Sequence, residues 1–414
     1  MDIYKLQFKG VIMTEKKNLF KRNTIKIEDL EEEDYKIKIR NHRIRILLVV
    51  LLVIAVITGI TGYFRFSEKY KVYESGKVVD SLKREDADTV QYVSYANGVI
   101  KYSSDGACYI DGSLKVMWNI TYEMQNPIYA ISDDYVAIAD KGGNEVFVCN
   151  TNGQVSDIDT LLPVQKLSIS STGVVAALLE DDGKSWIRMF NSAGSGTILA
   201  EVSVIMDQSG YPADFCISQD GIKLGITHLK ISGGKLNTLA VFHNLDSVGE
   251  NKTDHLVSSK TFDDEIMPEM QYINDTTAVA VGTSEFDIFT GKQIPELTSQ
   301  QGIKGEILRT FYSNKYIGME IQNTESEEAY LINVYNTAGK EVFSKAVSEE
   351  YEQIQIWNEY IIMSNESSMA VYNLNGLEKY NGGFETAVQH VKPLSVNRYL
   401  LVTPSQLQIL QLQQ

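Results

Sequence analysis

The segments DYVAIADKGGNEVFVCNTNGQ (134–154) and GVVAALLEDDGKSWIRMFNSAG (173–194) carry the pattern that decides the fold. In each, a short apolar run ends in a turn, a second apolar run follows, and a turn containing Asn and Gly closes the unit. Short apolar runs bounded by Gly, Asn and Asp are typical of β-strands, because these residues supply the positive φ that tight turns require. We therefore predict that each segment is a β-hairpin.

Six further segments repeat this pattern along the chain, which gives eight hairpins in all. They are residues 98–113, 221–246, 277–292, 315–340, 359–376 and 398–412. The closing turns contain glycines at intervals of 37 to 55 residues: Gly112, Gly153, Gly194, Gly249, Gly291, Gly339 and Gly376. A period of about 40–50 residues with four short strands per unit is the signature of a β-propeller, whereas a solenoid has a shorter period. The prediction is an all-β propeller over residues 91–414 with eight blades. Seven blades are the alternative, because a strand within residues 72–95 would then complete the last blade.

A second feature, ahead of the repeats, is the run of 19 uncharged residues from Ile46 to Phe64. A helix of this length spans roughly 30 Å, which matches the apolar thickness of a bilayer. Five basic residues lie in 36–45, just before the run, and three lie in 65–71, just after it. The positive-inside rule therefore predicts a single-pass cell-membrane protein with a cytoplasmic N-terminus and an extracellular C-terminal domain.

The predicted order of parts follows from this segment. Residues 1–45 form a cytoplasmic tail, disordered or weakly helical, 46–64 a transmembrane helix, and 65–90 a linker with a first strand. A cleaved signal peptide is the alternative to an anchor. We favour the anchor, because the preceding tail is long and no small-residue cleavage site follows the apolar run.

The charge is unevenly divided between these parts. The whole chain has a net charge of −16, of which residues 1–45 contribute +4, so that the remainder carries −20. Nucleic-acid binding requires a basic surface, and an acidic main domain argues against it. We expect partners other than nucleic acid.

No motif for catalysis, a cofactor or a metal stands out, and we assign no site residues of these three kinds. The five histidines lack the spacing of metal ligands. We expect Cys108, Cys149 and Cys216 to be buried thiols, without a disulfide between Cys108 and Cys149. The acidic pairs 133–134, 181–182 and 263–264 are typical of hairpin turns. The histidines are His42, His228, His243, His255 and His390.

Two kinds of segment resemble known propellers. LSISSTGVVAALLE (167–180) and FCISQDGIKLGITH (215–228) resemble a hairpin of WD-type and TolB-like propellers. VYNTAGKEV (334–342) and VYNLNGLEK (371–379) resemble blade ends of those folds and of quinoprotein-like propellers. With three tryptophans, the chain largely lacks the docking tryptophans of quinone-type blades, so this resemblance implies no quinone cofactor.

The whole arrangement resembles an uncharacterised family of single-span bacterial membrane proteins with an extracytoplasmic propeller. The resemblance and the pattern together predict a binding or scaffolding module of the cell envelope, with an envelope protein or polymer as partner and no enzymatic activity. One alternative is a hydrolase or lyase of cell-wall or extracellular glycan, which a cluster of Asp, Glu and His on one ring face would favour. The other is a single-span sensor that signals to the tail.

Overall fold

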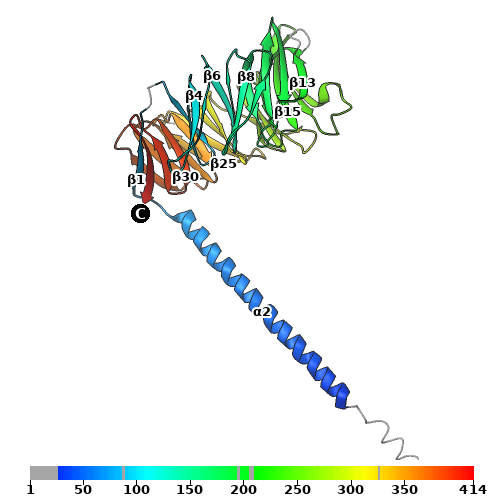
Figure 1. Cartoon of the computed structure of the whole chain (residues 1–414), viewed down its shortest axis with the longest axis vertical. Coiled ribbons are helices and arrows are strands. Elements are labelled where there is room, and N and C mark those ends of the chain that lie inside the picture. Colours follow the sequence, from blue (N-terminus) through cyan, green and yellow to red (C-terminus); the bar gives the residue numbers. More distant parts are fainter. Residues whose placement is uncertain (1–26, 86–88, 194–195, 205–208, 325–326) are drawn as a thin grey trace, which may run out of the picture. The chain divides into compact units, whose positions relative to one another are not determined.

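The computed structural model describes residues 27–85, 89–193, 196–204, 209–324 and 327–414. The chain forms two compact units, Met1–Lys71 and Val72–Gln414. The first contains one described helix, and the second contains all the described strands (Figure 1). Gly194, one of the glycines predicted to close a repeat, lies outside the described residues.

Helix α2 (Ile27–Tyr70) contains the stretch predicted to cross a membrane. Its segment Tyr35–Gly62 is the one helical stretch of the described chain that is long and apolar enough to do so. The Thr58 and Thr61 hydroxyls donate hydrogen bonds of 2.9 Å to carbonyls one turn earlier in the helix. These two polar groups are therefore satisfied within the helix, as an apolar surrounding requires.

The helix begins earlier than the apolar run. It includes residues 27–45 of the predicted tail, which we expected to be disordered or weakly helical. The first 26 residues of that tail lie outside the described part of the chain.

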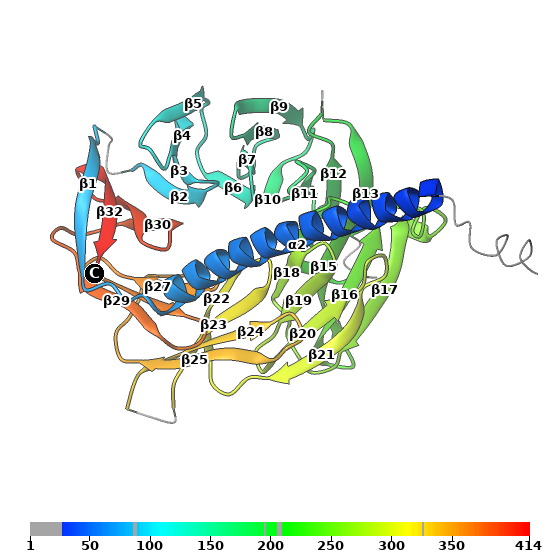
Figure 2. The same ribbon diagram turned by 90° about the horizontal axis from the view of Figure 1, so that it is seen from below.

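Residues 72–414 form eight four-stranded antiparallel sheets, which are the blades of a β-propeller (Figure 2). The predicted fold class is confirmed, and the number of blades is eight rather than seven. Blades 1 to 4 contain β2 (Gln91–Tyr95), β3 (Gly98–Ser103), β4 (Gly106–Asp111) and β5 (Val116–Thr121); β6 (Pro127–Ser132), β7 (Tyr135–Asp140), β8 (Glu145–Asn150) and β9 (Gly153–Asp159); β10 (Val164–Ile169), β11 (Val175–Asp181), β12 (Lys184–Phe190) and β13 (Ile198–Val204); and β14 (Tyr211–Ile217), β15 (Lys223–Ser232), β16 (Lys235–Asn244) and β17 (Leu256–Phe262), with the 3-10 turn η1 (Thr253–His255) before β17. Blades 5 to 8 contain β18 (Glu269–Asn274), β19 (Thr277–Val281), β20 (Glu285–Thr290) and β21 (Glu296–Gly302); β22 (Ile307–Tyr312), β23 (Tyr316–Gln322), β24 (Tyr330–Asn336) and β25 (Glu341–Val347); β26 (Gln353–Trp357), β27 (Tyr360–Ser364), β28 (Ser368–Asn373) and β29 (Glu378–Gly383); and β30 (His390–Ser395), β31 (Arg398–Val402), β32 (Gln406–Gln413) and β1 (Ser75–Lys83).

The eight hairpins read from the sequence are the second and third strands of the eight blades. The second strands are apolar on both faces because each blade packs between two neighbours; all five residues of β19 (TAVAV), for example, are buried. Eight apolar clusters fill the interfaces between blades. The core is thus divided into eight layers around the ring.

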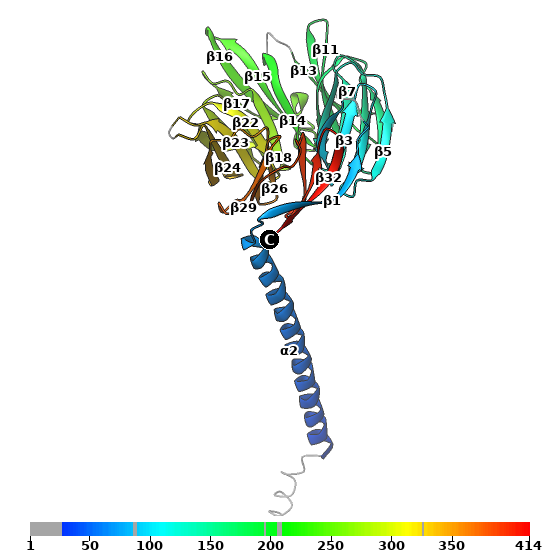
Figure 3. The same ribbon diagram turned by 90° about the vertical axis from the view of Figure 1, so that its left-hand side faces the viewer.

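The ring closes by pairing the two ends of the propeller. Strand β1 is the outermost strand of blade 8, where it pairs with β32 from Ser75 opposite Gln413 to Lys83 opposite Gln406 (Figure 3). On the inner side, β2 of blade 1 contacts β30 of blade 8. Because the ring is closed, every blade packs against two neighbouring blades.

The turn between the third and fourth strands is built in the same way in six blades. An Asp or Asn at the end of the third strand accepts a hydrogen bond from the backbone N–H two residues later, at 2.8 to 3.1 Å. In blade 5 the equivalent residue is Thr290. The six acceptors are Asp111, Asn150, Asn191, Asn244, Asn336 and Asn373.

Candidate binding site in the central channel

The inner strands of blades 2 to 7 converge at their carboxyl ends on a cavity of 520 Å³. The cavity opens on the face that carries the turns between first and second strands. Strand β1 begins on the same face, since Ser75 pairs with Gln413 and the neighbouring Leu412 donates to Asn397 in such a turn. The chain therefore enters the propeller on the face where the cavity opens.

The cavity wall is rich in side chains that form hydrogen bonds without carrying charge. Five aromatic residues accompany them, of which Tyr129 is 42% exposed. Charged residues in the wall are few: Lys166, Asp133 and Asp214. The uncharged hydrogen-bonding residues are Ser132, Ser168, Gln219, Gln271, Ser313, Asn314 and Asn358, and the other aromatic residues are Phe215, Tyr272, Tyr312 and Trp357.

An ion pair links two inner strands in this wall. The Lys166 ammonium on β10 bonds to Oδ1 of Asp214 on β14. Asp214 is buried, and it also accepts the backbone N–H groups of Phe215 at 2.7 Å and Met270 at 3.0 Å. Asp214 thus connects blades 3, 4 and 5.

A second carboxylate lies next in this network. Glu269 accepts hydrogen bonds from the hydroxyls of Thr310 and Tyr312, at 2.8 to 2.9 Å. Burial raises the pKa of Glu269, and its hydrogen bonds from the two hydroxyls oppose this rise. Burial also raises the pKa of Tyr312 well above its usual range. Asp214 lies close enough to Glu269 for its charge to contribute to the raised pKa of Glu269.

A histidine and a serine meet on the opposite side of the ring. Nε2 of His390 on β30 lies 2.9 Å from Oγ of Ser94 on β2, and its Nδ1 lies 3.1 Å from Nε2 of Gln353. The Gln353 amide is fixed, because its oxygen accepts the N–H of Val391 and its nitrogen donates to the carbonyl of Gln389. Nδ1 of His390 is therefore an acceptor, and Nε2 carries the proton that is donated to Ser94.

Burial, together with the charge of Lys392, lowers the pKa of His390 to about 4, so that the imidazole is neutral near pH 7. In this arrangement His390 does not accept the proton of Ser94. The pair therefore lacks the geometry of a serine nucleophile and its base.

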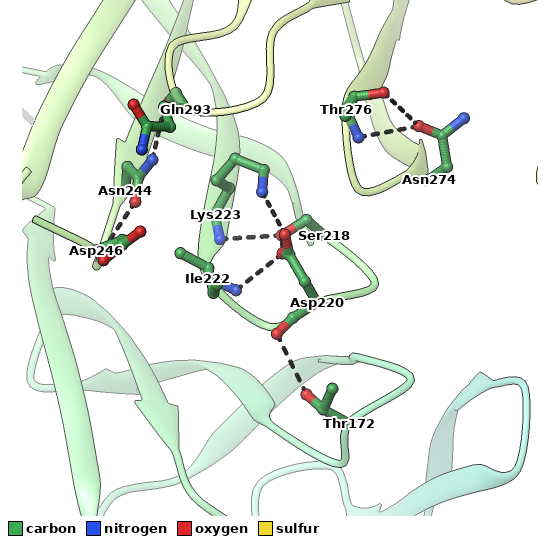
Figure 4. Close-up of polar contacts among 10 residues, drawn as sticks. All are labelled: Thr172, Ser218, Asp220, Ile222, Lys223, Asn244, Asp246, Asn274, Thr276 and Gln293. Atoms are coloured by element: carbon green, nitrogen blue, oxygen red, sulfur yellow. Dashed lines mark hydrogen bonds and ion pairs between the residues drawn. The ribbon is translucent and has the colours of Figure 1, made fainter. Parts of the chain in front are cut away.

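Polar contacts within the segment SQDGIK (218–223) stabilise the turn between β14 and β15 (Figure 4). The Lys223 side chain is buried, and its ammonium lies 2.6 Å from Oδ2 of Asp220. Burial disfavours the Asp220 carboxylate, but hydrogen bonds from Lys223, Ser218 and the Ile222 backbone outweigh it and lower the pKa of Asp220. In the related segment SSTGV (170–174), the Ser170 hydroxyl accepts the backbone N–H of Val174, four residues later.

The residues that the sequence drew attention to do not gather at one place. His228 pairs with Leu239 and His243 pairs with Leu224, so the two histidines are not opposite each other in their hairpin. In the described residues, no group of three or more His, Cys, Asp or Glu side chains is arranged to hold a metal ion. His42 lies in helix α2 and His255 in η1.

The acidic pairs and the cysteines have the expected surroundings. Each acidic pair supplies one turn residue with positive φ, at Asp133, Asp182 and Asp264. The three cysteines are buried thiols.

The channel residues were missed in the sequence because they belong to different blades. Lys166, Asp214, Glu269 and Tyr312 are isolated polar positions in inner strands, 43 to 55 residues apart. The one feature of the sequence that could have indicated them is a polar or charged residue in an inner strand that recurs about once per blade. These residues come together only because the blades form a closed ring.

Comparison with solved structures shows a propeller likeness at low identity. Sqt1 from Saccharomyces cerevisiae is 12% identical, with 82% of this chain and 100% of that chain covered and a TM-score of 0.51. BamB from Moraxella catarrhalis is 12% identical, over 81% and 100% of the two chains, with a TM-score of 0.48. The WD40 domain of SCAP from fission yeast is 10% identical, over 82% and 98%, with a TM-score of 0.49.

At such identities the likeness concerns the fold alone, and the Sqt1 comparison supports it. No curated protein matches the chain. A family profile matches residues 69–412, which is nearly the whole propeller. The chain therefore belongs to the family of unknown function DUF5711.

Proposed function

We propose that the protein is a membrane-anchored binding module of the cell envelope, and that it holds part of an envelope protein or polymer in the central cavity. The observation that carries this proposal is the cavity of 520 Å³ where the inner strands of six blades converge. Its wall combines accessible aromatic rings with amides and hydroxyls, which suits a polar ligand that forms directed hydrogen bonds. The six strands belong to one closed ring, so the wall is rigid before binding, which reduces the entropic cost of association.

The hydrogen bonding of the channel favours binding over hydrolysis. Both oxygens of Asp214 and both oxygens of Glu269 accept hydrogen bonds from the protein itself. A glycan hydrolase needs one carboxyl group directed at the scissile bond and another directed at water or the sugar. The two carboxylates are instead engaged in linking neighbouring blades.

The apolar helix supports the membrane part of the proposal. Tyr35–Gly62 is long enough to anchor the chain, and the excess of basic residues before it favours a cytoplasmic N-terminus. The propeller then faces the exterior, where an envelope protein or polymer is accessible to it.

Chemical crosslinking in intact cells tests the proposal. The tagged full chain is compared with Tyr129→Ala/Gln271→Ala in the cavity, with Met117→Ala on the outer strand β5, and with a version lacking residues 1–26. Specific envelope components should be captured by the full chain, the Met117 control and the shortened chain, and lost with the cavity variant. Equal capture by the cavity variant would contradict a site in the channel, and loss with the shortened chain would favour a sensor that signals through its tail.

A further inference from the structure

Asp287 is a fully buried carboxyl group in the third strand of blade 5. It has 0% exposure, and neither of its oxygens has a hydrogen-bond partner among the described residues. Buried polar groups in native proteins are nearly always hydrogen-bonded, because an unpaired one loses its hydration without compensation. The position of Asp287 therefore requires an explanation.

Polar residues at the equivalent position of other blades do have partners. Arg188 in blade 3 and Asn333 in blade 6 also lie three residues before the closing turn. Each bonds to the residue directly opposite it on the fourth strand. Arg188 donates to Glu201 at 2.6 Å, and Asn333 accepts from Ser344 at 2.8 Å.

In blade 5 the residue opposite Asp287 is engaged elsewhere. Gln300 faces Asp287 across the strand pair, but its amide donates to both carboxylate oxygens of Glu285, at 2.8 Å. Asp287 thus lacks the partner that this fold supplies in blades 3 and 6.

A cation lies across the interface with blade 4. Asp287 is paired in register with Ala280, and Lys260 on β17 is paired with Ala240. Ala240 and Ala280 belong to the same buried cluster between the two blades. Asp287 and Lys260 therefore face the same interface, separated by small side chains.

Three charged groups face Asp287. Lys260 comes from β17, Glu265 from the segment between β17 and β18, and Glu285 from the same strand as Asp287. The Lys260 ammonium lies 5.8 Å from the centre of the Phe262 ring and is not bonded to Asp287.

We propose that Asp287 and Lys260 form a proton-controlled contact between blades 4 and 5. When the Asp287 carboxyl is neutral, apolar packing holds the interface and Lys260 remains over the Phe262 ring. When the carboxyl loses its proton, the Lys260 ammonium moves to pair with it, and β17 shifts against β20. The released proton goes to solvent.

The electrostatic surroundings agree with this geometry. Burial first, and then the charge of Glu285, raise the pKa of Asp287 to about 7; Lys260 lowers it and Glu265 raises it. Ionisation therefore falls within the range of pH that a domain meets outside a cell.

Hydrogen–deuterium exchange of the full chain in detergent tests the contact. Exchange is measured at about pH 5 and about pH 9 and corrected for the intrinsic rate at each pH. Peptides covering β17 and β20 should exchange several-fold faster at the higher pH, because the shift of β17 against β20 opens the apolar packing of the neutral state, and peptides of blades 1 and 2 should not change.

Three variants separate the parts of the proposal. Asp287→Asn has no proton to lose, so its exchange should be equal at the two pH values. Lys260→Met leaves the ionised carboxylate without a partner, so the transition should move to higher pH. Asp263→Asn, at an exposed position beside the same interface, should behave as the parent protein.

A parent protein without the pH difference, or Asp287→Asn with the parent's difference, would overturn the proposal. An unchanged transition in Lys260→Met would show that Lys260 is not the partner and would also overturn it.

Discussion

Buried ionisable residues in the propeller owe their properties to contacts between distant segments. His390 is held neutral by burial and by the charge of Lys392, and its ring nitrogens contact Ser94 and Gln353, which come from two other blades. The sequence showed that the histidines lack the spacing of metal ligands, but it contained no sign of these partners, because Ser94 lies 296 residues away. The same holds for Asp287 and Lys260, which face the same interface only because blades 4 and 5 pack together.

Acid should weaken the fold through His390. Its pKa of about 4 in the folded protein lies below the usual value of 6.5, so unfolding takes up a proton as the pH falls. Stability from this residue is complete above about pH 6.5 and is lost as the pH falls toward 4, by on the order of 1–3 kcal/mol. This loss of stability is measured by comparing the thermal unfolding midpoints of the full chain and of His390→Gln at pH values from about 6.5 down to about 4.

The variant should lose less stability in acid than the parent protein, and His42→Gln in helix α2 should behave as the parent. Equal acid sensitivity of the His390 variant and the parent would be inconsistent with a neutral, buried imidazole.

At the scale of single elements, the sequence was most informative. Turn residues act on their own neighbours, so the Asn–Gly pattern and its period were visible without a structure. The Asn336 oxygen, for example, accepts the N–H groups of Ala338 and Lys340, both at 3.0 Å. Each hairpin of the repeat was therefore predictable, whereas the contacts of the inner strands with the inner strands of other blades were not.

Removing a turn acceptor should destabilise its blade. Asn336→Ala leaves two backbone N–H groups without their partner and should lower the free energy of unfolding by about 1–2 kcal/mol. Asn336→Asp keeps the acceptor oxygen and should lose less than half of that amount. Denaturant unfolding of the full chain in detergent distinguishes the two, and equal losses would mean that the turn does not depend on this acceptor.

At the scale of the whole propeller, the sequence predicted the fold class and offered a strand within residues 72–95 that completes the last blade, which β1 does, but it left the number of blades open. The period and the eight hairpins gave the architecture, but eight and seven blades remained open. The deciding contact is the pairing of β1 with β32, which joins residues more than 300 positions apart. The cavity also depends on segments that are far apart in the sequence, since its lining residues range from Tyr129 to Asn358.

The closure can be locked by a disulfide. Ser75 and Gln413 are directly opposite each other, so Ser75→Cys/Gln413→Cys should form a disulfide on oxidation. Because the enclosed loop contains nearly the whole propeller, the oxidised protein should gain up to about 5 kcal/mol over the reduced one. The native cysteines are buried and should not compete.

Ser75→Cys/Gln408→Cys is the matched control, because Gln408 is opposite Ser81 rather than Ser75. Non-reducing electrophoresis and unfolding midpoints report both pairs. Equal crosslinking of the control pair would contradict the observed register.

Site-directed photocrosslinking in intact cells tests the central claim most directly. A photoreactive amino acid replaces Tyr129 in the cavity wall of the full chain, and Met117 on the outer strand β5 in a separate control; the two side chains are 42% and 44% exposed. Binding in the central channel predicts a discrete crosslinked species with an envelope component from position 129 and none from position 117. Crosslinks from position 117 alone, or equal crosslinks from both, would place the interaction outside the channel and contradict the account.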